Sequence, residues 1–368
     1  MTMIESSLGR GSLKFTALLV LILGVQIATL WNSPFRLDDV RQIPAAQTKL
    51  MEEIRMVDPP ESEFDAIDRN RFRPLLWTYY LSLNSISGVP YQPRLYYMSG
   101  VFLHLLVSVL SWKLLILAGC NRGGAWIFLA MALANPSGIQ AVYWIAAHTD
   151  VIMALLALVS LLVRYHGWAV SGGVLCGLLV LCKSTAPALI CVTMACHHAV
   201  RGGFDKREWL RWLCGLAMTG IPGWVWRSVY IGTIWPTRPN AVEASLQDTS
   251  SVAVSAGAHG LLDMTTAGLS QYLPLSRDHV IMASCGILIA LISLVIMRRR
   301  SGSFSQILWG ASAIAGSMAP FAFGFNQYSD VGHTLGRMLY LPYLLWAGFA
   351  CLWTPARVHG ILLLIGEI

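Results

Sequence analysis

The sequence predicts an all-α polytopic membrane protein, a bundle of about ten transmembrane helices with a folded first outer loop. Of its 368 residues, 55% are hydrophobic and only 12% are charged, whereas a soluble domain carries about 25% charged residues. Several apolar runs reach the length of about 20 residues that a helix needs to cross a bilayer. The basic residues gather in short loops at 201–211 and 298–300. Such loops face the cytoplasm in most membrane proteins.

The first apolar run and the loop after it set the topology. The run at 12–31 is too long for a signal peptide and lacks its small-residue cleavage pattern, so we expect a retained helix that runs from inside to outside. The outer loop, 33–93, holds two helical patterns. Thr48 can cap the first pattern, and Pro74 suits the first turn of the second. The second is too short to span, and its aromatic residues suit the membrane interface.

The remaining apolar runs are expected to alternate across the membrane. In chain order they cover about 95–117, 125–141, 149–164, 168–182, 187–198, 213–231, 280–297, 307–325 and 338–353. A second outer segment, 232–278, holds a moderately apolar helix that we expect on the surface. The run at 361–365 is too short to span, so 354–368 resembles a helix cut off early. We therefore expect one transmembrane domain over 1–353.

Cysteine usage and charge exclude several kinds of protein. The eight cysteines lie in or beside apolar runs without a CxxC pair. They indicate packing residues, with neither a disulfide framework nor a metal site. The net charge of +7 reflects topology, and no basic patch indicates nucleic-acid binding. No Gly-rich phosphate loop is present.

Asp38 and Asp39 follow the first apolar run directly. Carboxylates near a bilayer must be solvated, paired or neutralised. Burial and neighbouring charges can tune the pKa of such a group, which suits it to act as a general base. A plainer alternative is that the two residues cap the next helix or mark the exit of the chain into water.

Ionisable residues also gather where the expected helices meet the outer side. They are Arg73, Arg94, His148, Asp150, Lys183, Arg227, His333 and Arg337. Any one could be a snorkelling anchor, although Lys183 and Arg227 lie within otherwise apolar sequence. His104 could face the same cavity or make a hydrogen bond in the packed interior. Arg and Lys both bind phosphate. A cavity with these cations beside a carboxylate pair suggests group transfer from a phosphorylated membrane lipid, of which a polyprenyl-phosphate sugar fits best.

Five stretches carry short motifs in a fixed order. They are Phe35-Arg36-Leu37-Asp38-Asp39, then Phe72-Arg73-Pro74-Leu75 with Asn84, Gly88 and His104, then Asn135-Pro136 to Ala141-Val142-Tyr143-Trp144-Ile145 with Asp150, then Leu181-Cys182-Lys183, and finally Arg337-Met338-Leu339-Tyr340-Leu341-Pro342. Through them the chain resembles the GT-C superfamily of polyprenyl-phosphate-sugar glycosyltransferases. It is most similar to the membrane part of the transmembrane-and-TPR O-mannosyltransferase family and its bacterial relatives.

The sequence departs from the pattern of that family at four positions. Asn135 replaces the usual His and Gln140 replaces the usual Glu. His148 replaces the usual Arg, and Ser184 replaces the acidic residue that follows the Lys. No TPR array follows the last expected helix. The acceptor could therefore differ from that of the family, and some donor contacts could be rearranged.

The resemblance implies inverting sugar transfer on the non-cytoplasmic face. Asp38 would be the catalytic base and Asp39 would orient the acceptor or a metal. The donor phosphate would be bound by Arg73, His148, Lys183 and Arg337, whose charges stabilise the leaving group. Further candidates for the site are Arg94, His104, Asp150, Arg227, His333 and Tyr340. The sequence holds no convincing metal-ligand cluster, although superfamily members differ in their need for a divalent ion.

The expected partners are a polyprenyl-phosphate-linked sugar, the bilayer, and an acceptor that is a glycan, a lipid or a protein. We expect an integral protein of a bacterial inner membrane, with a cytoplasmic N-terminus and a periplasmic site. A transporter or flippase for a lipid-linked sugar is the alternative, but such proteins usually show repeat symmetry and broken midplane helices, which are not evident here. An inactive GT-C relative is the third alternative.

Overall fold

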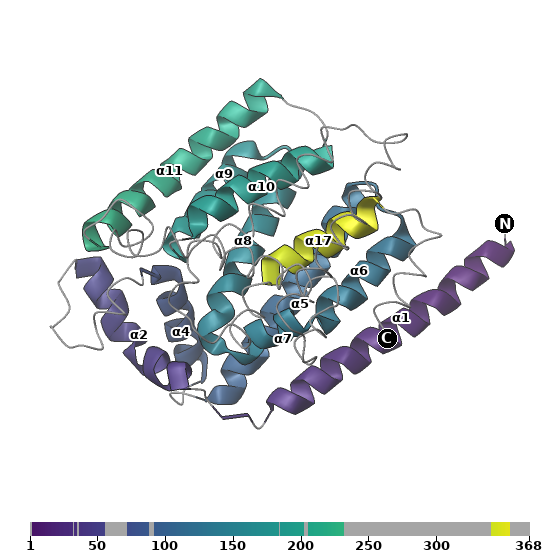
Figure 1. The fold of residues 1–368 in the computed structure, drawn as a ribbon, viewed down its shortest axis with the longest axis horizontal. Coiled ribbons are helices and arrows are strands. Elements are labelled where there is room, and N and C mark those ends of the chain that lie inside the picture. Colours follow the sequence, from purple (N-terminus) through teal and green to yellow (C-terminus); the bar gives the residue numbers. More distant parts are fainter. Residues whose placement is uncertain are drawn as a thin grey trace, which may run out of the picture.

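The computed structural model describes residues 2–31, 33–34, 37–55, 72–87, 92–183, 185–201, 205–231 and 340–353 (Figure 1). All regular structure in these ranges is helical, as expected. The helices are α1 (Thr2–Leu30), α2 (Leu37–Arg55), α4 (Pro74–Ser87), α5 (Pro93–Leu117), α6 (Arg122–Ala134), α7 (Pro136–Tyr143), η1 (Ile145–Ala147), α8 (His148–Tyr165), α9 (Ala169–Gly177), η2 (Leu178–Leu181), α10 (Ala186–Arg201), α11 (Lys206–Ile231) and α17 (Tyr340–Trp353).

Two helices of the described part, α5 and α8, are long and apolar enough to cross a membrane. Shorter apolar helices cover Thr16–Leu30, Arg122–Ala134, Ala169–Leu181 and Ala186–Val200. The expected helices at 280–297 and 307–325 lie outside the described residues, as do the segments 232–278 and 354–368.

One helix boundary differs from the expected one. The helix in the first loop begins at Leu37 and runs through Pro44, so Thr48 lies inside it and does not cap it. The helix over 125–141 is interrupted at Asn135-Pro136, where the sequence itself predicts a break, because Pro136 lacks a backbone donor and begins the new helix α7. Asp38 and Asp39 therefore fall in the first turn of α2, where a negative charge is favoured by the helix dipole.

Contacts between helix ends show that α5, α8 and α10 run in one direction and that α11 runs in the other. At one end, which we call the Lys183 end, the turn before α10 meets the start of α8 through Lys183 and Asp150. At the other, the Arg164 end, the last turn of α8 meets the first turn of α11 through Arg164 and Glu208. The Tyr165 hydroxyl also donates to the carbonyl oxygen of Leu117, the last residue of α5, at 3.0 Å.

The closest helix pair is α9 against α11, and glycine makes the approach possible. A Cβ on Gly173 would collide with the backbone of Trp212 and Gly215, and one on Gly177 would collide with Thr219. Gly173 and Gly177 are four residues apart and so lie on one face of α9, the small-residue spacing that lets membrane helices pack closely. Thr219 then donates to the carbonyl of Val174 across this interface at 2.8 Å.

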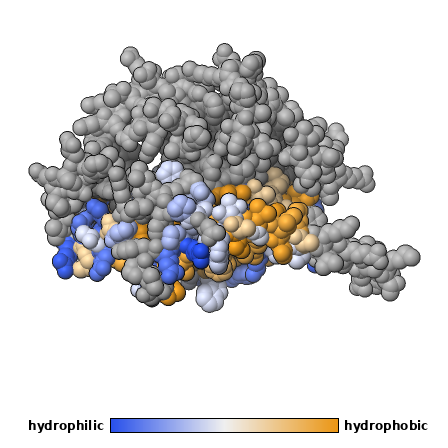
Figure 2. All heavy atoms as spheres, turned by 90° about the horizontal axis from the view of Figure 1, so that it is seen from below, coloured by the Kyte–Doolittle hydropathy of each residue, from blue (hydrophilic) through white to orange (hydrophobic). Residues whose placement is uncertain are grey.

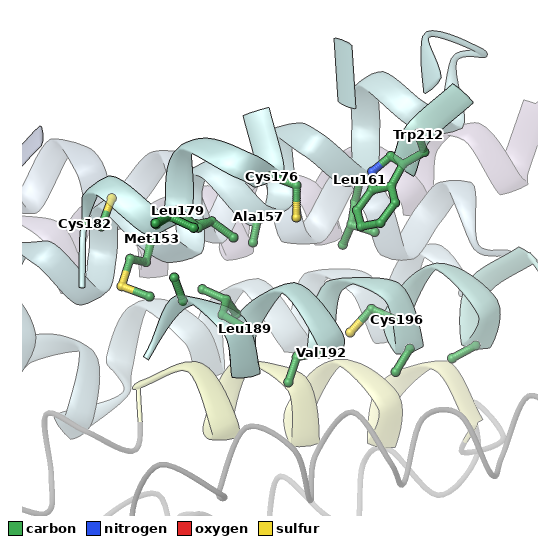
Figure 3. Packing of buried hydrophobic residues seen from close by; sticks show 14 of the residues in the cluster. Met153, Ala157, Leu161, Cys176, Leu179, Cys182, Leu189, Val192, Cys196 and Trp212 are labelled. Carbon is green, nitrogen blue, oxygen red and sulfur yellow. The ribbon is translucent and has the colours of Figure 1, made fainter. Parts of the chain in front are cut away.

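The largest apolar core lies where α8, α9, α10 and α11 meet. Figure 3 shows Met153 and Ala157 of α8 on one side and Leu189 and Val192 of α10 on the other, with the thiol of Cys176 of α9 nearby. All seven cysteines in the described residues are free thiols. The cysteines of this core act as small apolar packing residues, as expected.

Helix α2 lies across the Lys183 end and packs against α4 beside the last turns of α11 (Figure 1). Its buried residues Ile43 and Ala46 join a core with Leu76 and Tyr80 of α4 and with Ile145 of η1. In the view from below, polar residues gather toward the side of α2, and apolar residues gather toward the side of α1 (Figure 2). The first loop is therefore folded in its described part.

Exposed apolar side chains follow the outer face of α11. They recur at intervals of three to five residues and comprise Leu210, Leu213, Met218, Ile221, Val225 and Val229. A second exposed apolar set lies on α1 and includes Leu18, Val20, Leu21 and Val25. Contiguous exposed apolar surface of this kind suits contact with lipid or with another protein.

Candidate functional site

An ion pair between Lys183 and Asp150 marks the centre of the candidate site. The Lys183 Nζ donates to Asp150 Oδ1 at 2.8 Å, and each side chain is 23% exposed. An ammonium group has three donors, and this contact uses one. The contact holds the ammonium group in place, and the partial exposure of both side chains leaves them within reach of a ligand from solvent.

The local fold explains why Lys183 faces outward. The 3-10 helix η2 ends at Leu181, and the amide of Ala186 then donates to the carbonyl of Lys183 at 3.1 Å, closing a tight turn. Cys182 is only 1% exposed and belongs to the core between α8 and α10. The turn thus anchors one residue in the apolar core and places its neighbour, Lys183, beside the start of α8.

Arg73 lies close to this pair. The thiol of Cys182 is near enough to both Arg73 and Asp150 for their charges to act on it. Arg73 itself precedes Pro74, the first residue of α4, and its carbonyl accepts from the amides of Leu76 and Trp77. The structure therefore brings together three of the predicted residues, Arg73, Asp150 and Lys183.

Glu53 is a site residue that the sequence did not reveal. Its side chain is 1% exposed. Oε1 accepts from the backbone amide of Arg73 at 3.0 Å and from Trp77 Nε1 at 2.7 Å, while its backbone carbonyl accepts from Trp226 Nε1 at 2.8 Å. Burial raises the pKa of Glu53 to about 7, against the opposing effect of these hydrogen bonds and of the charge on Arg73.

A signal for Glu53 was present in the spacing of α2. Ile43, Ala46 and Leu50 lie on one face of the helix, and Glu53 follows at the same helical interval. A carboxylate on the buried face of an amphipathic helix must find donors there, because an unpaired buried charge is strongly unfavourable. This spacing was a signal for a buried contact of Glu53 that the sequence analysis missed.

His148 is fully buried, and both of its ring nitrogens have partners. Nε2 lies 3.1 Å from the carbonyl oxygen of Val142, which can only accept, so Nε2 carries a proton. Nδ1 lies 3.0 Å from the Tyr79 hydroxyl, which also contacts Ser99 Oγ at 2.6 Å. A neutral imidazole here would accept from Tyr79. Gly100 leaves the room that this ring occupies.

These contacts make His148 a link between α8, α7 and α4. Its place beside Asp150 agrees with the prediction that it belongs to this region. In the structure as it stands, a phosphate would have to displace either Tyr79 or the carbonyl of Val142 to reach a ring nitrogen.

Three further predicted residues have other partners. His104 Nδ1 lies 2.9 Å from the Tyr340 hydroxyl, and both side chains are buried, so they join α5 to α17. The guanidinium of Arg227 is 2% exposed and lies 4.7 Å from the ring centre of Trp224. These placements agree with the packing role considered for His104.

Arg94 lies beside the start of α2. Its Nε donates to the carbonyl oxygen of Trp31 at 3.0 Å, and its guanidinium lies 5.3 Å from the ring of that residue. The hydroxyl of Tyr97 donates to the carbonyl of Pro34 at 2.7 Å. Both contacts hold the chain between α1 and α2 against the first turns of α5.

Asp38 and Asp39, the predicted catalytic carboxylates, lie at the opposite end of α2 from Arg73. The backbone of Asp38 and Asp39 is in the first turn of α2, and their side chains lie outside the described part. Because a helix rises about 1.5 Å per residue, Asp38 is about 22 Å along α2 from Glu53. The backbone of Arg73, bonded to Glu53, lies near that distant end. His333 and Arg337 are outside the described residues.

No cluster of three or more His, Cys, Asp or Glu side chains suited to a metal ion occurs among the described residues. Comparisons of the chain with protein-family models, with curated proteins and with solved structures find no match.

Proposed function

We propose that the protein is a membrane-embedded glycosyltransferase of the GT-C type. It would move a sugar from a polyprenyl-phosphate donor to an acceptor hydroxyl on the non-cytoplasmic face, with inversion at the anomeric carbon. The observation that carries this proposal is the partly exposed Lys183–Asp150 pair beside Arg73, at the end of the bundle that α2 crosses. The resemblance of five ordered motifs to that superfamily supports it independently.

The cations of the Lys183 end suit the leaving phosphate. A phosphate brought to this end would meet the ammonium of Lys183 and the guanidinium of Arg73. Arg and Lys neutralise a phosphate by charge-assisted hydrogen bonds, and donors aimed at a developing charge lower the barrier to its formation. Asp150 already fixes Lys183 in position, so less conformational entropy is lost when the donor binds.

In the proposed reaction, Asp38 or Asp39 removes the proton of the acceptor hydroxyl. The acceptor oxygen attacks the anomeric carbon and forms the new glycosidic bond. The bond from that carbon to the phosphate oxygen breaks, and its electron pair leaves with the polyprenyl phosphate. Inverting glycosidases use a related geometry with water in place of the acceptor. Asp38 and Arg73 lie at opposite ends of α2, so about 22 Å of helix separates the predicted base from this cation.

We infer a membrane domain of about ten spans over 1–353, with the Lys183 end outside and the Arg164 end in the cytoplasm of a bacterial inner membrane. In this topology α5, α8 and α10 run from the outside to the cytoplasm and α11 runs back, which fits the contacts between their ends. The exposed apolar faces of α11 and α1 would then contact lipid. The basic loop at 201–211 follows α10 at the Arg164 end, as the positive-inside rule expects.

The test is sugar transfer by the full chain in nanodiscs with a labelled polyprenyl-phosphate sugar and membrane-extract acceptors. Asp38→Asn should abolish transfer while binding of polyprenyl phosphate persists, and Asp39→Asn should lower transfer less. Lys113→Gln changes an exposed lysine of α5 and is the matched control, for which we expect no change. Wild-type rates in Asp38→Asn would refute the assignment of the base. Movement of the lipid-linked sugar across the bilayer without transfer would identify a flippase.

A further inference from the structure

Glu53 of α2 makes a hydrogen bond to the start of another helix, α4. Helix α4 begins at Pro74 and has no acidic residue in its first turn. The first amides of a helix lack partners within the helix. Glu53 of α2 supplies an acceptor from outside, because its Oε1 accepts from the amide of Arg73 at 3.0 Å.

The same oxygen binds a second donor, Trp77 Nε1, at 2.7 Å. Trp77 lies one turn further along α4, so a single carboxylate oxygen fixes both the start of the helix and its rotation. The backbone carbonyl of Glu53 accepts from Trp226 Nε1 at 2.8 Å, which adds α11 to the junction. The rings of Phe72 and Trp226 pack edge to face beside it, with centroids 5.0 Å apart.

Within the described part of the chain, Arg73, just before α4, and Lys49 of α2 act on the carboxyl of Glu53 by charge, while Lys49 itself pairs with Glu52 at 3.3 Å. The second oxygen of Glu53, Oε2, is buried and has no hydrogen-bond partner. A fully buried carboxyl with one oxygen unpartnered is costly for stability alone, which points to a role in arranging its neighbours.

We propose that Glu53 is a positioning residue, which holds the first turn of α4 so that Arg73 stays beside the Lys183–Asp150 pair. This inference deepens the proposed function and rests on it, since Arg73 is taken to bind the donor phosphate. Glu53 itself touches neither donor nor acceptor in this proposal. The structural claim is the narrower one, that the position of Arg73 depends on the carboxyl oxygen of Glu53.

The first experiment needs no activity. Hydrogen exchange of the Arg73 amide is measured by mass spectrometry of the full chain in nanodiscs. Glu53→Ala removes the acceptor and should speed exchange of this amide about tenfold or more. Glu53→Gln keeps an acceptor oxygen and should retain protection. Glu52→Gln, next to it in sequence, removes a partly buried carboxylate that pairs with Lys49, and should leave exchange of the Arg73 amide unchanged. Unchanged exchange in Glu53→Ala would overturn the proposal.

If Glu53→Ala does not fold, Glu53→Asp replaces it. The shorter side chain keeps the charge and withdraws the oxygen from the Arg73 amide, so exchange should again be faster. Exchange in Glu53→Asp at the wild-type rate would equally overturn the proposal.

The second experiment separates positioning from general loss of structure. The affinity for polyprenyl phosphate is measured for Arg73→Ala, Glu53→Ala and the double variant. Arg73→Ala keeps the backbone amide that Glu53 binds, and should weaken affinity about tenfold. If Glu53 acts through Arg73, the double variant binds no more weakly than Arg73→Ala, and Glu53→Gln restores affinity. Additive losses would overturn the proposal. A wild-type chain that binds no polyprenyl phosphate would refute the proposed function, and the exchange rates alone would then decide whether Glu53 holds Arg73.

Discussion

Lys183 Nζ lies 2.8 Å from Asp150 Oδ1, and this ion pair joins the turn before α10 to the first turn of α8. The carboxylate holds the ammonium group in place, but it also neutralises part of its charge. Any anion that approaches Lys183 must therefore meet Asp150 as well.

We predict opposite effects from changing the two partners. Lys183→Gln should weaken binding of polyprenyl phosphate about tenfold, because it removes a charge-assisted contact. Asp150→Asn should strengthen binding a few-fold, because it removes a nearby like charge. The affinities are measured in nanodiscs at low and high salt, and the gain in Asp150→Asn should shrink as salt screens the charges. Weaker binding in both variants would show that the ion pair only stabilises the local fold and that Lys183 does not bind the phosphate directly.

The pair should contribute little to folding stability. Both partners are partly exposed, and such ion pairs contribute about 0–1 kcal/mol. The thermal midpoints of Lys183→Gln and Asp150→Asn in detergent should therefore stay within a few degrees of wild type. A large loss of stability in either variant would contradict the prediction and would complicate the affinity comparison.

Glu53 should make the stability of the protein depend on pH. Burial raises the pKa of this carboxyl from 4.5 to about 7 in the folded chain. Between these values the folded state binds the proton more tightly than the unfolded state does. This contribution to stability is thus fully present below about pH 4.5 and is lost as the pH rises to about 7, by at most about 1.4 kcal/mol per pH unit.

Glu53→Gln removes this titration, so its stability should fall less than that of wild type between pH 5 and 7. The measurement is the thermal midpoint in detergent across that range, followed through tryptophan fluorescence, because Trp77 and Trp226 both contact Glu53. Glu52→Gln is the control and should track wild type. Identical pH profiles for wild type and Glu53→Gln would contradict the prediction.

At the Arg164 end of the bundle, Arg164 should contribute strongly to the stability of the folded protein. Its side chain is 2% exposed, and its Nε lies 3.0 Å from Glu208 Oε1. The guanidinium lies 4.4 Å from the ring centre of Trp209 and 5.3 Å from that of Trp212. Breaking a buried ion pair by removing one partner costs roughly 3–5 kcal/mol, so Arg164→Ala should destabilise the chain strongly.

Arg164→Lys should restore only part of this stability. Lysine keeps the charge but lacks the planar group that stacks on an indole ring. Thermal midpoints in detergent report both changes, with Arg122→Ala, at an exposed arginine of α6, as the control. The loss in the Arg164→Ala, Glu208→Ala double variant should be smaller than the sum of the single losses. Additive losses would show that the two residues act separately.

The sequence predicted the helical class and the places where most helices end. Prolines and glycines mark such ends locally, as at Pro74, Pro93 and the Asn135–Pro136 break. Hydropathy then placed α5 and α8, whose apolar runs are long. The start of α2 was predicted too late, because Thr48 was taken as its cap, whereas the helix begins at Leu37 and contains Pro44.

Of the candidate site, the sequence predicted which residues are charged at helix ends, but not which of them meet. The Lys183–Asp150 contact depends on how α8 packs against the turn after η2. The involvement of Glu53 depends on the packing of α2 against α4 and α11. Such pairings between residues far apart in the chain are set by three-dimensional packing, and one sequence without aligned homologues does not encode them in any local pattern. Buried His148 is the clearest case, since its partner Tyr79 lies 69 residues away in the chain.

Gly173 should be among the residues of the bundle least tolerant of a side chain. A Cβ there would meet the backbone of Trp212 and Gly215, which cannot move as a flexible side chain could. Gly173→Ala should therefore force α9 and α11 apart and destabilise the chain, by an amount typical of overpacking, about 1–3 kcal/mol.

Gly24 of α1 provides the matched control, because a Cβ at this position meets nothing within 4 Å. Gly24→Ala should leave stability unchanged or raise it by roughly 0.5–1 kcal/mol, since alanine loses less backbone entropy in a helix. The thermal midpoints of the two variants in detergent should thus move in opposite directions. Equal effects would mean that α9 and α11 do not approach as closely as the Gly173 contacts require. Because α9 leads through η2 to Lys183, the same displacement should also weaken phosphate binding at the Lys183 end.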